Sequence, residues 1–181
     1  SVFNTLRDYP EKTIIFQGND YSLEFKASDI NRVVPQTQVY DFRMSFDSPN
    51  SPEIYSLMDA YSGNGDIINR AVFVYFEHDG SQEGPLPLPG PAILHLNLGN
   101  KYGSSTLYWH YYNEERDRID YYGSVKSNRQ GTIAVRVDHF STYIVTPYHR
   151  IVGSEDLSSA IDALGSGGKT NPYTGLREVR F

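Results

Sequence analysis

The stretch Ser105–Lys126, STLYWHYYNEERDRIDYYGSVK, holds the single tryptophan of the chain and five of its fifteen tyrosines. Its first half alternates between two sets of side chains, which is the two-residue period of a β-strand. A polar loop, Asn113–Asp117, separates this run from a second alternating run that begins at Arg118. Two such runs joined by five residues predict a β-hairpin.

The loop length also predicts which side chains share a face of this hairpin. Tyr111 is expected to face Ile119, and Trp109 to face Tyr121, as an apolar set that points into the core. The other face is expected to be one exposed patch of six side chains, in three cross-strand pairs roughly 5 Å apart. The pairs are Tyr108 with Tyr122, His110 with Asp120, and Tyr112 with Arg118.

Composition limits the class of protein. A chain of 181 residues is long enough for one sizeable domain. Its formal charge of −6 argues against binding a polyanion such as nucleic acid, because contacts to phosphates supply most nucleic-acid affinity. No cysteine is present for disulfides or thiolate metal sites, and no apolar run approaches the ~20 residues of a membrane span. The sequence begins without a signal peptide, so we expect a segment of a mature protein.

The remaining pattern predicts more strands than helices. Strand-like runs lie at residues 12–17, 21–26, 38–46, 70–76, 92–98, 132–138 and 141–146. Ser51-Pro52-Glu53 is typical of a helix start with Ser51 as N-cap, and Gly84–Pro91 is too rich in proline for a strand interior. About nine strands with one or two short helices predict an all-β, antiparallel two-sheet sandwich of jelly-roll-like type.

Two parts of the chain differ in character. Residues 1–147 are expected to form the β-sandwich module, and residues 148–181 a C-terminal helix followed by a linker-like tail. The helix is predicted to open at Ser154, and the glycine-rich residues 165–168 are typical of a flexible linker. The segment is either a linker toward another module or a strap on the domain. We expect its helix to pack on the sandwich and its last dozen residues to be loosely held.

Four motifs carry a resemblance to a known group of proteins: Asp79-Gly80, Gly99–Gly103, Leu107–Glu115 and Asp138–Val145. In this order they resemble modules repeated in large secreted proteins of Gram-positive anaerobes, the clostridia and ruminococci, including cellulosome-like systems. The resemblance implies a non-catalytic module of an extracellular protein, secreted or attached to the cell surface, with neighbouring modules in the same protein. Trp109 and His110 depart from the residues usual in that group, and Asn171–Gly175 resembles a tail motif that often follows such modules.

The six-residue patch favours carbohydrate binding. A sugar ring stacks its apolar face on an aromatic ring, while its hydroxyls need hydrogen-bonding partners. Tyr108 and Tyr122 are the expected stacking platform. The expected polar partners are His110, Asp120, Tyr112 and Arg118. The alternative is that the tyrosine pairs only stabilise the hairpin. Further candidates for ligand contact are the loop residues Tyr61, Tyr102 and Tyr148.

Support for catalysis is weak, since the sequence lacks the common hydrolase, metalloprotease and nucleotide-binding motifs. His139 beside Ser141 is better explained as a bend residue that holds a strand end than as part of a triad. Asp47, Asn50 and Glu53 favour helix capping over a calcium site. We therefore expect no enzyme, metal or cofactor, but a polysaccharide-binding module for starch or a plant β-glucan. The alternative is a structural, adhesion or protein-docking spacer without a glycan ligand.

Overall fold

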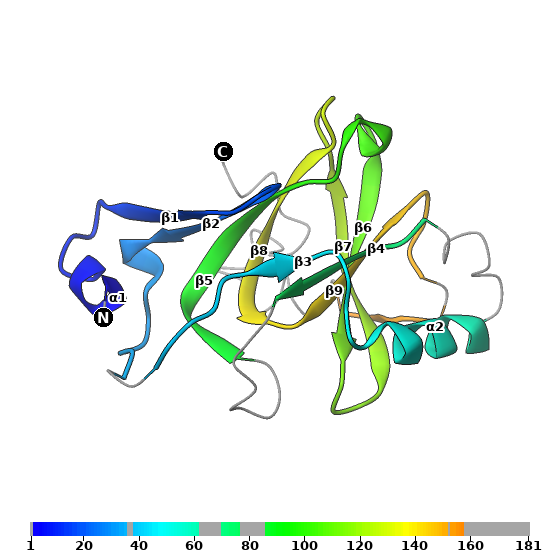
Figure 1. Ribbon diagram of the computed structural model, residues 1–181, viewed down its shortest axis with the longest axis horizontal. Helices are drawn as coiled ribbons and strands as arrows, with labels where there is room; N and C mark the ends of the chain where they lie inside the picture. Colours follow the sequence, from blue (N-terminus) through cyan, green and yellow to red (C-terminus); the bar gives the residue numbers. More distant parts are fainter. Residues whose placement is uncertain (1, 36–37, 62–69, 77–85, 152, 158–181) are drawn as a thin grey trace.

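Two β-sheets pack on each other in the part of the chain that this computed structural model describes, residues 2–35, 38–61, 70–76, 86–151 and 153–157 (Figure 1). The first sheet has the order β1-β2-β5-β8: Thr13–Gln17, Tyr21–Lys26, Leu86–Asn97 and Thr132–Phe140. The second has the order β10-β7-β6-β9-β4-β3: Glu155–Asp156, Arg118–Lys126, Thr106–Asn113, Thr142–Pro147, Val72–Phe76 and Met44–Ser45. The predicted all-β, two-sheet architecture is confirmed. Neighbouring strands are antiparallel except β10, which runs parallel to β7.

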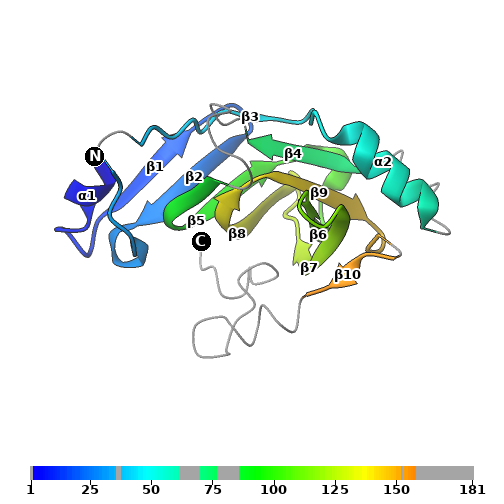
Figure 2. The ribbon, with the colours of Figure 1, turned by 90° about the horizontal axis from the view of Figure 1, so that it is seen from below.

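Figure 2 shows the two sheets from a second direction. The core lies between them and is rich in aromatic rings. Trp109 of β6 stacks on Tyr143 of β9 with ring centroids 4.8 Å apart, and both are fully buried. Phe76 of β4 stacks on Phe140, the last residue of β8, at 4.6 Å. A single residue, Ser141, then joins β8 of the first sheet to β9 of the second. The alternation of apolar residues along each strand therefore produces the buried layer that it predicts.

Two segments differ from their predicted structure. Of residues 38–46, only Met44–Ser45 forms a strand, although Tyr40 and Phe42 pack against the core as alternation requires. Residues 86–91 of the proline-rich run belong to β5, not to a connection, and residues 84–85 lie outside the described residues. The prolines are tolerated because the pairing with β8 is interrupted between Pro87 and Ala92, and because the Pro89 carbonyl accepts hydrogen bonds from two backbone N–H groups outside the sheet.

Helices play a small part. They are α1 (Val2–Leu6), α2 (Ser51–Ala60) and the short 3-10 turns η1 (Ala27–Asp29) and η2 (Asn100–Tyr102). Ser51 is the first residue of α2 and not its N-cap, which is Asn50. Where a C-terminal helix is predicted to open, Glu155 and Asp156 instead form β10. The rest of that predicted helix, Asp79-Gly80 and the 171–175 motif lie outside the described residues.

Within the described ranges, no helix combines the length and the apolarity needed to cross a bilayer.

Candidate functional site

The central hairpin, β6 with β7, is paired differently from the prediction. Tyr111 faces Asp120 and His110 faces Tyr121, a shift of one residue from the expected partners. Between Trp109 and His110 the register shifts again, and the pairing passes over Tyr122, so that Trp109 faces Gly123. Gly123 has a φ of 131°, and this bulge inserts one extra residue into β7. Because strand side chains alternate, the one-residue shift at the hairpin loop places Tyr122 on the same face as Tyr111.

The predicted tyrosine platform is therefore wrong in its geometry. Tyr122 is only 6% exposed and stacks on Tyr111 inside the core, with centroids 5.7 Å apart. Burial raises the pKa of the Tyr122 hydroxyl. Tyr108 lies beside Tyr121 instead, with ring planes 41° apart, and Arg150 covers the Tyr121 ring at 5.2 Å. The expected burial of Trp109 is confirmed.

His110 is a fully buried structural residue, not an exposed polar contact. Its Nδ1–H donates to the Ile144 carbonyl at 3.0 Å, and its Nε2 accepts from the Ile151 N–H at 3.0 Å. Only the neutral imidazole can make both bonds, because Nε2 must keep its lone pair. Burial lowers the pKa of His110 to about 3. The imidazole thus ties β6 to β9 on one side and to the segment after β9 on the other.

The other three members of the predicted patch are also engaged in the fold. Asp120 is 1% exposed and accepts from Arg118 Nε at 2.7 Å and from Asn113 Nδ2 at 3.3 Å. Tyr112 is buried and donates to the Asp117 carboxylate at 2.9 Å. Ile151 and α2 cover the face of the hairpin that carries His110 and Tyr112, and β10 pairs with the edge of β7. The six residues do not form one exposed patch.

An open cleft lies at the opposite end of β6 from its hairpin loop. We call it the Tyr148 cleft, and its volume is about 530 Å³. The described residues that line it are Arg70, Lys101, Tyr102, Ser105, Thr106, Pro147 and Tyr148. Two of the three loop tyrosines considered in the sequence, Tyr102 and Tyr148, therefore meet here, and Tyr61 is not among the lining residues.

Tyr148 presents its ring to solvent from an unusual backbone conformation. The side chain is 71% exposed, and its φ of 69° lies in the left-handed region that bulky residues seldom adopt. The His149 N–H donates to the Pro147 carbonyl at 2.8 Å, which closes a γ-turn centred on Tyr148. The Thr146 hydroxyl donates to the His149 carbonyl at 2.9 Å and holds the turn. Such strain costs about 1–3 kcal/mol and is concentrated at functional sites.

The cations of the cleft lie against its tyrosines. The Arg70 guanidinium is 5.0 Å from the centroid of the Tyr148 ring, and Lys101 Nζ is 5.2 Å from that of Tyr102. Tyr102 is buried and donates from its hydroxyl to the Arg70 carbonyl at 3.1 Å. This bond fixes Arg70 beside η2, whose exposed Lys101 is thereby placed on the same cleft.

Two glycines support the loop that carries Lys101. Gly131 has a φ of +83°, and a Cβ there would lie 1.9 Å from the Gly99 carbonyl oxygen. Gly131→Ala is expected to lower the free energy of unfolding by about 2–4 kcal/mol, through backbone strain and the clash together. Gly99→Ala is the matched control: nothing lies within 4 Å of its Cβ, so it should cost only the backbone strain of its φ of +91°, about 1–3 kcal/mol, and less than Gly131→Ala. Denaturant unfolding measures both, and equal losses would contradict the close approach.

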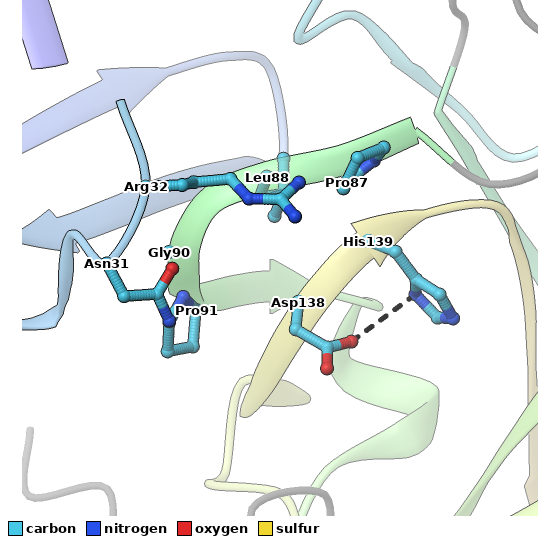
Figure 3. A pocket seen from close by; sticks show the side chains of 8 residues that line it. All are labelled: Asn31, Arg32, Pro87, Leu88, Gly90, Pro91, Asp138 and His139. Carbon is cyan, nitrogen blue, oxygen red and sulfur yellow. Dashed lines mark ion pairs between the residues drawn. The ribbon is translucent and has the colours of Figure 1, made fainter. Parts of the chain in front are cut away.

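A second cleft, of about 470 Å³, lies over β5 and the end of β8 and contains Arg32, Asp138 and His139 (Figure 3). A carboxylate, an imidazole and a guanidinium are groups that acid–base catalysis uses. The nearest approach of Asp138 to His139 is 3.6 Å, however, which is longer than a hydrogen bond. His139 Nδ1 lies 2.8 Å from the Tyr143 hydroxyl, which donates to the His139 carbonyl. This arrangement fastens the end of β8 to β9.

Metal binding finds no support among the described residues, where no three His, Asp or Glu side chains gather around a common point. Asn50, a residue of the calcium alternative, donates to Glu114 of the hairpin loop.

Comparisons with protein families, with curated proteins and with solved structures find no match. Of the two clefts described above, the Tyr148 cleft has the exposed aromatic ring.

Proposed function

We propose that this chain is a non-catalytic module of an extracellular bacterial protein and that it binds a polysaccharide in the Tyr148 cleft. The observation that carries the proposal is the Tyr148 ring, held 71% exposed by a strained γ-turn at the mouth of a cleft. A fold that needed this ring only for stability would bury it, as it buries Trp109 and Tyr122.

The lining of the cleft suits a sugar. A sugar ring offers an apolar face to an aromatic side chain and hydroxyls around its edge. Ser105 and Thr106 contribute side-chain hydroxyls, and the Ser105 hydroxyl donates to the Gly103 carbonyl, which leaves its oxygen able to accept. Arg70 and Lys101 contribute donors. The cleft thus combines one stacking surface with several polar groups, the usual composition of a ligand site.

Tyr148→Gly separates binding from stability. The variant is expected to lose about tenfold or more in glycan affinity, because the stacking surface is removed. It should gain about 1 kcal/mol in stability, because glycine adopts a positive φ without strain. Affinity electrophoresis on amylopectin, xyloglucan, hydroxyethylcellulose and polygalacturonate measures binding, and thermal unfolding measures stability. Tyr9→Ala, which removes another exposed tyrosine far along the chain, should change neither.

The second candidate is a structural or protein-docking spacer that meets neighbouring modules and binds no glycan. The observation in its favour is that the tyrosines of the hairpin, the densest aromatic segment of the sequence, are largely used in packing. A spacer would be retarded by none of the polymers, and Tyr148→Gly would change only its stability. Retardation of the unmodified module that disappears in Tyr148→Gly supports polysaccharide binding instead.

A further inference from the structure

We infer that the ligand of the Tyr148 cleft is an acidic polysaccharide, one whose sugars carry carboxylate groups. This inference rests on the proposed function and narrows its ligand class. Two cations, Arg70 and Lys101, line the cleft, and none of the described lining residues is acidic. The chain as a whole has 22 acidic and 16 basic residues, so the sign of charge in the cleft is opposite to that of the average surface.

The geometry of Arg70 matches a carboxylate. The central carbon of its guanidinium lies over the Tyr148 ring, 5.0 Å from the centroid. A guanidinium has five N–H donors in a planar fork, which fits a carboxylate with two parallel hydrogen bonds. A sugar that stacks on the exposed face of Tyr148 would bring a carboxylate at its rim close to Arg70.

Lys101 extends the same charge along the cleft. Its ammonium lies 5.2 Å from the Tyr102 ring, and the Tyr102 hydroxyl holds the Arg70 backbone. The two cations are thus positioned through one buried tyrosine and are not independent surface residues. A polymer with a carboxylate on each sugar can meet both, whereas a neutral glucan would leave both charges without an anionic partner. The formal charge of −6 works against any polyanion, so the attraction to an acidic glycan comes from the two cations of the cleft.

The test compares two polymers that differ in charge alone. Polygalacturonate carries a carboxylate on each sugar, and its highly methyl-esterified form has the same backbone without most of the charge. Native affinity electrophoresis at low salt is run with the unmodified module, with Arg70→Gln and with Lys101→Gln. We expect retardation by polygalacturonate only, a loss of about tenfold in affinity in each variant, and a marked weakening as sodium chloride is raised. Arg116→Gln, in the exposed loop at the far end of the hairpin, should behave as the unmodified module does.

Each contrary result has a distinct meaning. Equal retardation by both polymers, lost in Tyr148→Gly but kept in Arg70→Gln and Lys101→Gln, would overturn the acidic ligand while leaving polysaccharide binding in place. Retardation by none of the glycans would overturn the proposed function itself. Equal loss in Arg116→Gln, or full competition by poly-L-glutamate, would show attraction to any polyanion and would also overturn the inference. Thermal unfolding of each variant confirms that the module is folded during the measurement.

Discussion

The free energy of unfolding is expected to fall by about 2 kcal/mol from His110 alone as the pH is lowered from 7 to 5. The folded-state pKa of His110 is about 3, whereas an unfolded histidine titrates near 6.5. Below pH 6.5 the unfolded chain therefore binds a proton at His110 that the folded chain does not bind. This proton uptake favours the unfolded state. The stability contributed by His110 is complete above pH 6.5 and is lost progressively as the pH falls toward 3.

The variant His110→Asn isolates this contribution. It should be less stable at pH 7 by about 1–3 kcal/mol, because the Ile151 N–H loses its acceptor. Its stability should then change less between pH 7 and 5 than that of the unmodified module. Burial also lowers the pKa of His95, but that contribution is common to both proteins. Denaturant unfolding followed by Trp109 fluorescence measures both slopes. Equal slopes would contradict the neutral, buried His110.

Trp109→Ala is expected to destabilise the module by about 3–5 kcal/mol, the cost of emptying a fully buried aromatic site. The indole stacks on Tyr143 between the two sheets, so the cavity would open in the centre of the core. Trp109→Phe should cost less than about 2 kcal/mol, because it keeps a stacked ring and removes an indole N–H that has no hydrogen-bond partner.

Thermal unfolding followed by far-ultraviolet circular dichroism measures both tryptophan variants, since neither retains the fluorescent reporter. A chain that does not fold with alanine but folds with phenylalanine agrees with the account. Equal stability of Trp109→Ala and the unmodified module would contradict a buried indole.

Ligand should also leave the tryptophan fluorescence of the unmodified module nearly unchanged, because Trp109 lies in the core and not in the Tyr148 cleft.

Much of the fold follows from local pattern. The two-residue period of the hairpin strands and of residues 132–138 and 141–146 predicts strands that the structure contains. Pattern is less informative where a strand needs a partner. Residues 38–43 alternate correctly and partly bury Tyr40 and Phe42, yet they form no strand, because no strand within the described ranges pairs with them. The prolines of β5 led to the opposite error. They predict a connection, but the segment is a strand, because an irregularity in its pairing with β8 accommodates them.

The predicted site is wrong because the register between β6 and β7 was predicted incorrectly. Loop length alone gave a pairing one residue away from the actual one, and a slip of one residue exchanges the two faces of a strand. Gly123 within β7 was the available signal, since a glycine inside a strand often marks a bulge. The packing of Ile151 and α2 on the outer face of the hairpin, and the pairing of β10 with β7, are long-range contacts, which no local pattern reveals. Tyr148 was a candidate by type, but its positive φ and its pairing with Arg70 appear only in three dimensions.

The most direct test of the central claim maps the binding surface in solution. The measurement is a heteronuclear nuclear magnetic resonance titration of the module with an oligogalacturonate. The account predicts chemical-shift changes concentrated at Lys101, Thr106 and Tyr148, with the Trp109 indole signal unmoved. Changes centred on the half-buried pair of Tyr108 and Tyr121, or spread evenly over the surface, would contradict it.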